Sequence, residues 1–132
     1  MNAVEKTKIL LVEDDNLFLW ALNQFLRREG YDVCQANSGE LALEMAQKEF
    51  FDVVISDFCL PGLNGKELIK QVKSLSPLTK TVLISACQME ETGGTDESLL
   101  NAYLNKPIEF VNLKRLLRDL TAQTAHGETH RL

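Results

Sequence analysis

The chain has 132 residues, 45% hydrophobic and 25% charged, which is the composition of one globular domain and excludes a disordered or fibrous chain. A net charge of −5 argues against nucleic acid as a direct partner, and no apolar run approaches the roughly 18 residues of a membrane span. The three cysteines, Cys34, Cys59 and Cys87, lack CxxC spacing, so we expect neither a disulfide framework nor a zinc site. A cytoplasmic location is the simplest expectation.

Apolar runs alternate with stretches of helical period through the first half of the chain. The pattern predicts a strand at 8–12, a helix at 17–29 and a short strand at 31–36. The next helix should start within 37–40. A capping residue there is followed three positions later by Glu40, the pattern of a capping box.

The same alternation continues through the second half of the chain. It predicts a buried strand at 52–56, a helix at 64–75, a buried strand at 81–84, a weaker strand at 102–104 and a helix at 108–120. Strands that alternate with helices form a parallel sheet with right-handed crossovers and helices on both faces. We therefore expect one doubly wound α/β domain over 8–121, with flexible ends at 1–7 and 122–132.

Chemically useful side chains follow the predicted strands directly. Glu13 and Asp14 follow the first strand, Asp57 the third, Ser85 the fourth and Lys106 the fifth. Because ligands bind beyond the carboxyl ends of the strands in such sheets, we expect these side chains to share one edge.

The three carboxylates of this set need a cation. At 4 Å each pair repels by roughly 4 kcal/mol at an effective dielectric of 20. Hard oxygen ligands suit Mg²⁺, and the Lys106 ammonium suits a phosphoryl oxygen. Asp57 then becomes a candidate nucleophile, since a carboxylate can form an aspartyl-phosphate. Asp15 is expected to cap the first helix rather than to bind metal.

Four motifs resemble those of the receiver domains of two-component response regulators. They are LVEDD at 11–15, ISDFCLPG at 55–62, LISA at 83–86 and YLNKP at 103–107, and the resemblance covers about residues 7–121. Any one motif is weak, but four in this order and spacing are specific. The resemblance implies a flavodoxin-like (βα)5 fold with strand order 2-1-3-4-5.

The resemblance also implies roles for single residues. Asp57 would be the phosphoacceptor, Asp14 a direct Mg²⁺ ligand and Glu13 a ligand through water. The backbone carbonyl of Cys59 would be a further ligand. Ser85 would be the switch hydroxyl, with a donor bond to the phosphoryl group.

Two further roles follow from the last motif. Tyr103 would be the aromatic residue whose rotamer follows the switch. Lys106 would bind the phosphoryl group, and its peptide bond to Pro107 would be cis.

The implied function is a phosphorelay switch. A sensor histidine kinase or phosphotransfer protein would supply the phosphoryl group, and a downstream effector would read the change. The domain would catalyse only its own phosphorylation and dephosphorylation, so we expect no enzyme activity on other substrates. Two alternatives stay open: a pseudo-receiver that binds partners without phosphoryl chemistry, and a hydrolase that turns over external phosphomonoesters.

Two features depart from the simple pattern. A receiver normally places a helix between Ser85 and Tyr103, but the adjacent Gly93 and Gly94 each cost roughly 1 kcal/mol against Ala inside a helix. We predict that this fourth helix is short, displaced or disordered. Cys59 and Cys87 each follow a site residue by two positions. They either tune hydrolysis as small side chains or form a reversible thiol pair.

Overall fold

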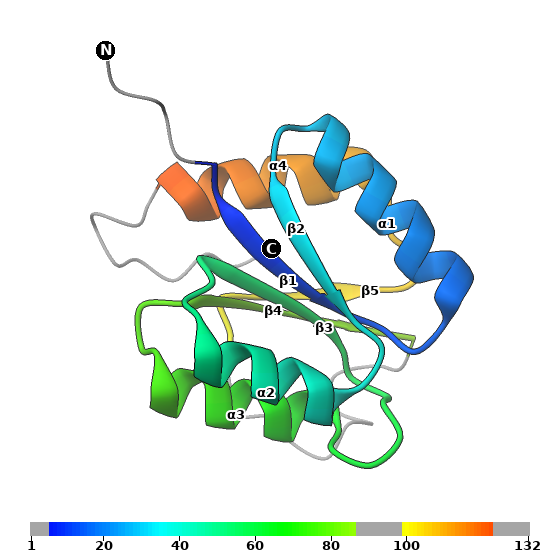
Figure 1. The fold of residues 1–132 in the computed structure, drawn as a ribbon. Helices are drawn as coiled ribbons and strands as arrows, with labels where there is room; N and C mark the ends of the chain where they lie inside the picture. Colours follow the sequence, from blue (N-terminus) through cyan, green and yellow to red (C-terminus); the bar gives the residue numbers. More distant parts are fainter. Residues whose placement is uncertain (1–5, 87–98, 123–132) are drawn as a thin grey trace.

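Five parallel strands form one sheet in the order β2-β1-β3-β4-β5 in the computed structural model, which describes residues 6–86 and 99–122 (Figure 1). The strands are β1 (Lys8–Val12), β2 (Asp32–Ala36), β3 (Val53–Asp57), β4 (Lys80–Ser85) and β5 (Ala102–Asn105). This order is the one that the family resemblance implied, and the doubly wound α/β fold is confirmed.

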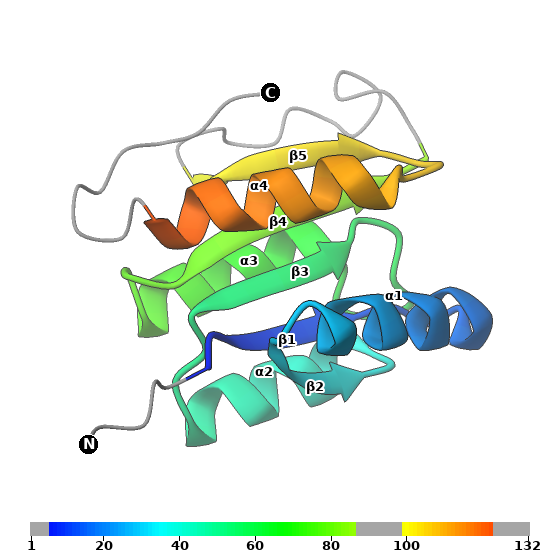
Figure 2. The ribbon, with the colours of Figure 1, turned by 90° about the horizontal axis from the view of Figure 1, so that it is seen from above.

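Four helices cover the two faces of the sheet within the described residues. They are α1 (Asn16–Arg28), α2 (Gly39–Lys48), α3 (Gly65–Leu75) and α4 (Phe110–Ala122). Figures 1 and 2 show α1 and α4 against one face and α2 and α3 against the other. No helix in the described part of the chain is both long and apolar enough to cross a membrane.

Alternate side chains of each strand enter different cores. Ile9 and Leu11 of β1 pack with residues of α1 and α4, such as Leu22 and Leu117. Leu10 and Val12 face the other way and pack with residues of α2 and α3. Successive strand side chains point to opposite faces, so continuous apolar runs are what a sheet covered on both sides requires.

Capping side chains set the start of three helices. The Asp15 carboxylate accepts from the backbone N–H groups of Leu17 and Phe18, as expected for the cap of α1. Ser38 caps α2 and Asn64 caps α3 in the same manner. A capped start removes unsatisfied N–H groups from the first turn.

One helix boundary differs from the sequence prediction, and several predictions are left untested. The last helix begins at Phe110 and not at 108, and its first backbone bonds run from the N–H groups of Asn112 and Leu113 to the Glu109 carbonyl. The peptide bond between Lys106 and Pro107 is cis, as the resemblance implied. Segment 87–98, with the predicted short or disordered helix and with Cys87 of the proposed thiol pair, lies outside the described residues. The same holds for residues 1–5 and 123–132 of the predicted flexible ends.

Candidate functional site

The carboxyl ends of the strands bring the predicted site residues to one edge of the sheet. Asp57 and Ser85 are the last residues of β3 and β4, and Glu13 and Lys106 directly follow β1 and β5. The register aligns these ends, since Asp57 pairs with Ile84 and the Lys106 N–H donates to the Ser85 carbonyl at 2.8 Å. Residues far apart in sequence thus meet because parallel strands end together.

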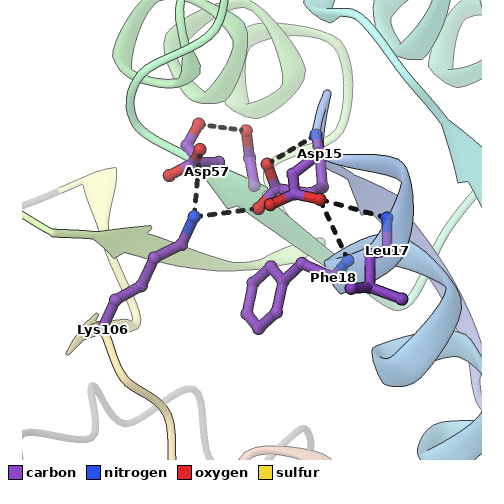
Figure 3. A network of polar contacts seen from close by, with 7 residues as sticks. Asp15, Leu17, Phe18, Asp57 and Lys106 are labelled. Carbon is purple, nitrogen blue, oxygen red and sulfur yellow. Dashed lines mark hydrogen bonds and ion pairs between the residues drawn. The ribbon is translucent and has the colours of Figure 1, made fainter.

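The Lys106 ammonium joins two of the buried carboxylates. Its Nζ lies 3.1 Å from Oε1 of Glu13 and 3.4 Å from Oδ2 of Asp57 (Figure 3). The side chains of Glu13 and Asp57 are 3% and 8% exposed, while that of Lys106 is 26% exposed. Two nearly buried negative charges therefore share one cation that still reaches solvent.

The Phe18 ring supports the same ammonium from α1. Lys106 Nζ lies 4.7 Å from the ring centroid, within the range of a cation–π contact, and Figure 3 shows the ring beside the lysine. Phe18 is half-buried against the core beneath α1 and α4. The sequence pattern gave no indication that Phe18 would reach the site.

Burial and neighbouring charges shift the pKa values of both Glu13 and Lys106. Burial raises the pKa of the Glu13 carboxyl, and the Asp57 charge raises it further, against bonds from the Asp15 N–H and Lys106 that lower it. Burial lowers the pKa of the Lys106 ammonium, but its bond to Glu13 and the Asp57 charge outweigh this and leave it above the ordinary value.

Three carboxylates form a group that fits a divalent cation. Oxygen atoms of Glu13, Asp14 and Asp57 all lie within 4.8 Å of one another, and Asp14 is exposed while the other two are buried. Hard oxygen ligands with one side open to water match the needs of Mg²⁺, which keeps several waters when bound. The three carboxylates therefore fit the Mg²⁺ ion that the sequence predicts.

The loop from β3 to α3 carries the other predicted ligand, the backbone carbonyl of Cys59. The path of the loop is fixed where it leaves Asp57, because the Phe58 N–H donates to the Ile84 carbonyl at 2.7 Å. Gly65 approaches β3 so closely that a Cβ there would lie 2.2 Å from the Asp57 carbonyl oxygen. The side chain of Cys59 itself is exposed.

Ser85 and Tyr103 lie on neighbouring strands at the predicted positions. Ser85 is fully buried at the end of β4. Tyr103 is half-buried on β5 and packs against the small core of Ile69, Leu83 and Leu100. These positions suit a switch pair, whose operation stays a prediction.

Three contacts around the site had no sequence signal of their own. The Phe18 ring contacts Lys106 and the Glu40 carboxylate bonds to Leu63, both more than fifteen positions away in sequence. The Gly65 backbone lies against the Asp57 carbonyl, eight positions away. Helical periodicity marked Phe18 only as an apolar position, and the capping pattern assigned Glu40 to its own helix. Side-chain direction across elements was needed to find them.

The comparisons with known proteins agree with this geometry. A family model described as the response regulator receiver domain matches residues 9–118. The transcriptional regulatory protein ZraR of Escherichia coli K12 is 35% identical over 88% of this chain and 26% of its own length. The response regulator protein FleR of Pseudomonas aeruginosa is 33% identical over 92% of this chain and 25% of its own length. The chain thus spans about a quarter of these relatives.

Solved structures show the same fold. A CheY-like receiver domain protein from Methanospirillum hungatei superposes with a TM-score of 0.85 at 28% identity, covering 93% of this chain and 100% of that one. TrrA from Thermotoga maritima, solved in complex with Mg²⁺-BeF, gives 0.80 at 28% identity, covering 88% and 99%. Family model, relatives and fold agree over nearly the whole chain, which therefore belongs to the response regulator receiver domain family.

Proposed function

We propose that this chain accepts a phosphoryl group on Asp57 from a histidine kinase or phosphotransfer protein and thereby changes its binding to an effector. The observation that carries the proposal is the buried Asp57 carboxylate, held 3.4 Å from the Lys106 ammonium and grouped with Glu13 and Asp14. A pseudo-receiver would have no need to keep three mutually repelling carboxylates and a lysine together.

The transfer is a single displacement at phosphorus. An Asp57 carboxylate oxygen attacks the phosphorus of a phosphohistidine, forming a P–O bond as the P–N bond breaks. The electron pair of the P–N bond stays on the imidazole nitrogen, which takes up a proton. Lys106 leaves Glu13 to contact a phosphoryl oxygen, and the Ser85 hydroxyl donates to another.

Glu13 and Asp14, with Asp57 and the Cys59 carbonyl, would hold Mg²⁺ at this site. The bound cation would neutralise charge on the transferring phosphoryl group. Support comes from the spacing of the three carboxylates and from the relative TrrA, whose structure contains Mg²⁺-BeF. The chain would act only on itself, in the cytoplasm where its kinase works.

Intact-mass measurement after incubation with acetyl phosphate and Mg²⁺ tests this function. The wild type should gain the mass of one phosphoryl group, and Asp57→Asn should gain none. Asp32→Asn is the matched control, because Asp32 is an exposed carboxylate at the opposite edge of the sheet. A wild type that takes up no phosphoryl group would indicate a pseudo-receiver instead.

A further inference from the structure

The first turn of α2 is bonded to the loop between β3 and α3. Oε2 of Glu40 accepts a hydrogen bond of 2.9 Å from the backbone N–H of Leu63. The cap of α2 is instead Ser38, whose Oγ accepts from the Leu41 N–H. The sequence position of Glu40 suggested a capping box, but its carboxylate does not serve in one. It bonds instead to a residue 23 positions away and so links α2 to the loop.

Two glycines show how closely the loop is fitted to α2. A Cβ on Gly39 would lie 2.2 Å from the Leu63 carbonyl oxygen. Gly62 has a φ of +72°, a conformation that favours glycine, and a Cβ there would lie 2.4 Å from the Glu40 carboxylate. The contact thus involves backbone on both sides, so it fixes the path of the loop as well as one side chain.

The opposite end of this loop is attached to β4 and α3. The Phe58 N–H donates to the Ile84 carbonyl, and the Phe58 carbonyl accepts from Leu60 and Gly65 at 3.2 and 3.0 Å. Cys59 lies between these bonds and the Glu40 bond. Its carbonyl is therefore held in a loop that has an anchor on each side.

We propose that Glu40 is a positioning residue for the phosphoryl site, acting through Leu63 on the loop that presents the Cys59 carbonyl. The inference rests on the proposed function, because that carbonyl matters only if the loop completes a Mg²⁺ site. Glu40 itself touches neither the metal site nor Asp57. Its contribution is to remove loop conformations in which the carbonyl points elsewhere.

Isothermal titration with MgCl₂ tests the proposal on four proteins. These are the wild type, Glu40→Ala, Glu40→Gln and Glu44→Ala. Glu40→Ala removes the acceptor and a charge, whereas Glu40→Gln removes the same charge but keeps an oxygen that can accept from Leu63. Glu44 lies one turn further along α2 and pairs with Lys48 at the surface, so Glu44→Ala controls for long-range charge.

Loss of one partly exposed hydrogen bond should weaken Mg²⁺ binding of Glu40→Ala about three- to tenfold. Glu40→Gln and Glu44→Ala should stay close to the wild type. Amide hydrogen exchange gives a second readout without metal: the Leu63 N–H should exchange faster in Glu40→Ala and stay slow in Glu40→Gln.

The remaining outcomes separate the two proposals. Equal Mg²⁺ affinity in the wild type and Glu40→Ala would overturn the positioning role and leave the proposed function intact. Equal weakening in Glu40→Ala, Glu40→Gln and Glu44→Ala would also overturn it, since charge alone would explain the effect. A wild type that binds no Mg²⁺ would overturn both the proposed function and the role of Glu40.

Discussion

The titration of Glu13 tests its electrostatic coupling to Asp57. Burial and the Asp57 charge raise its pKa above the ordinary value of 4.5. A carboxyl whose folded pKa is raised contributes stability below its unfolded pKa and loses that contribution as pH rises through the folded pKa. Carboxyl carbon NMR of the metal-free protein should show a Glu13 midpoint above 4.5 that falls in Asp57→Asn. A midpoint unchanged by that substitution would contradict the coupling.

The pair of Phe18 and Lys106 makes a second prediction at the scale of single residues. A double-mutant cycle with Phe18→Leu and Lys106→Met should give a coupling of about 0.5–1 kcal/mol in the free energy of unfolding. Phe25 provides the control, because its ring packs against Phe110 in a tilted arrangement with centroids 4.6 Å apart. The cycle of Phe25→Leu with Lys106→Met should show no coupling. Similar values in both cycles would mean that packing, and not the cation, is being measured.

At the scale of elements, Gly65 determines how near α3 can approach β3. Gly65→Ala should destabilise the protein by about 2 kcal/mol, because its Cβ would meet the rigid Asp57 carbonyl. Gly30→Ala should cost only about 1 kcal/mol, since the φ of +94° is strained for alanine but the space around it is open. Urea unfolding measures both.

Amide NMR adds a local readout to this comparison. The Phe58 N–H should shift in Gly65→Ala and not in Gly30→Ala, because only the former displaces the chain next to Asp57. A Gly65→Ala protein as stable as the wild type would show that α3 can retreat from β3 without cost.

The sequence was sufficient for most elements because its apolar patterns were strong. A continuous run such as Val53-Val54-Ile55 is typical of a strand that is covered on both faces. Ends of helices were harder. Leu75 continues the apolar spacing of α3, yet it is half exposed, because it is the last residue of that helix.

The site was predictable to the extent that topology alone creates it. Glu13, Asp57 and Lys106 meet because they end parallel strands, a rule that needs no coordinates. The Glu40 bond and the Phe18 contact depend on which way a side chain turns between elements. Local signals favoured a capping role for Glu40, and only the tertiary approach of loop and helix decided against it.

At the scale of the whole molecule, the metal site should couple to global stability. Anything that binds the folded state alone stabilises it by mass action, by about 2.7 kcal/mol at one hundred times its dissociation constant. Thermal unfolding with and without MgCl₂ should show a higher midpoint for the wild type. The increase should shrink strongly in Asp14→Ala, and equal increases in both proteins would place the metal elsewhere.

The way the chain enters β5 has a consequence for the position of Lys106. The Thr81 hydroxyl donates to the Leu99 carbonyl, and the N–H of Asn101 donates to the Thr81 carbonyl at 2.8 Å. The Asn101 side chain accepts from the Thr81 N–H at 2.8 Å and from the Lys73 ammonium at 3.1 Å. The chain is thereby fixed to β4 and α3 before β5 begins.

Lys106, which follows β5, is bonded to β4 as well. Its backbone N–H donates to the carbonyl of Ser85, the last residue of that strand. Both ends of β5 are thus bonded to β4 by residues that the structure describes. Lys106 is positioned through this strand, so substitutions at Thr81 or Asn101 would change the placement of the ammonium from a distance.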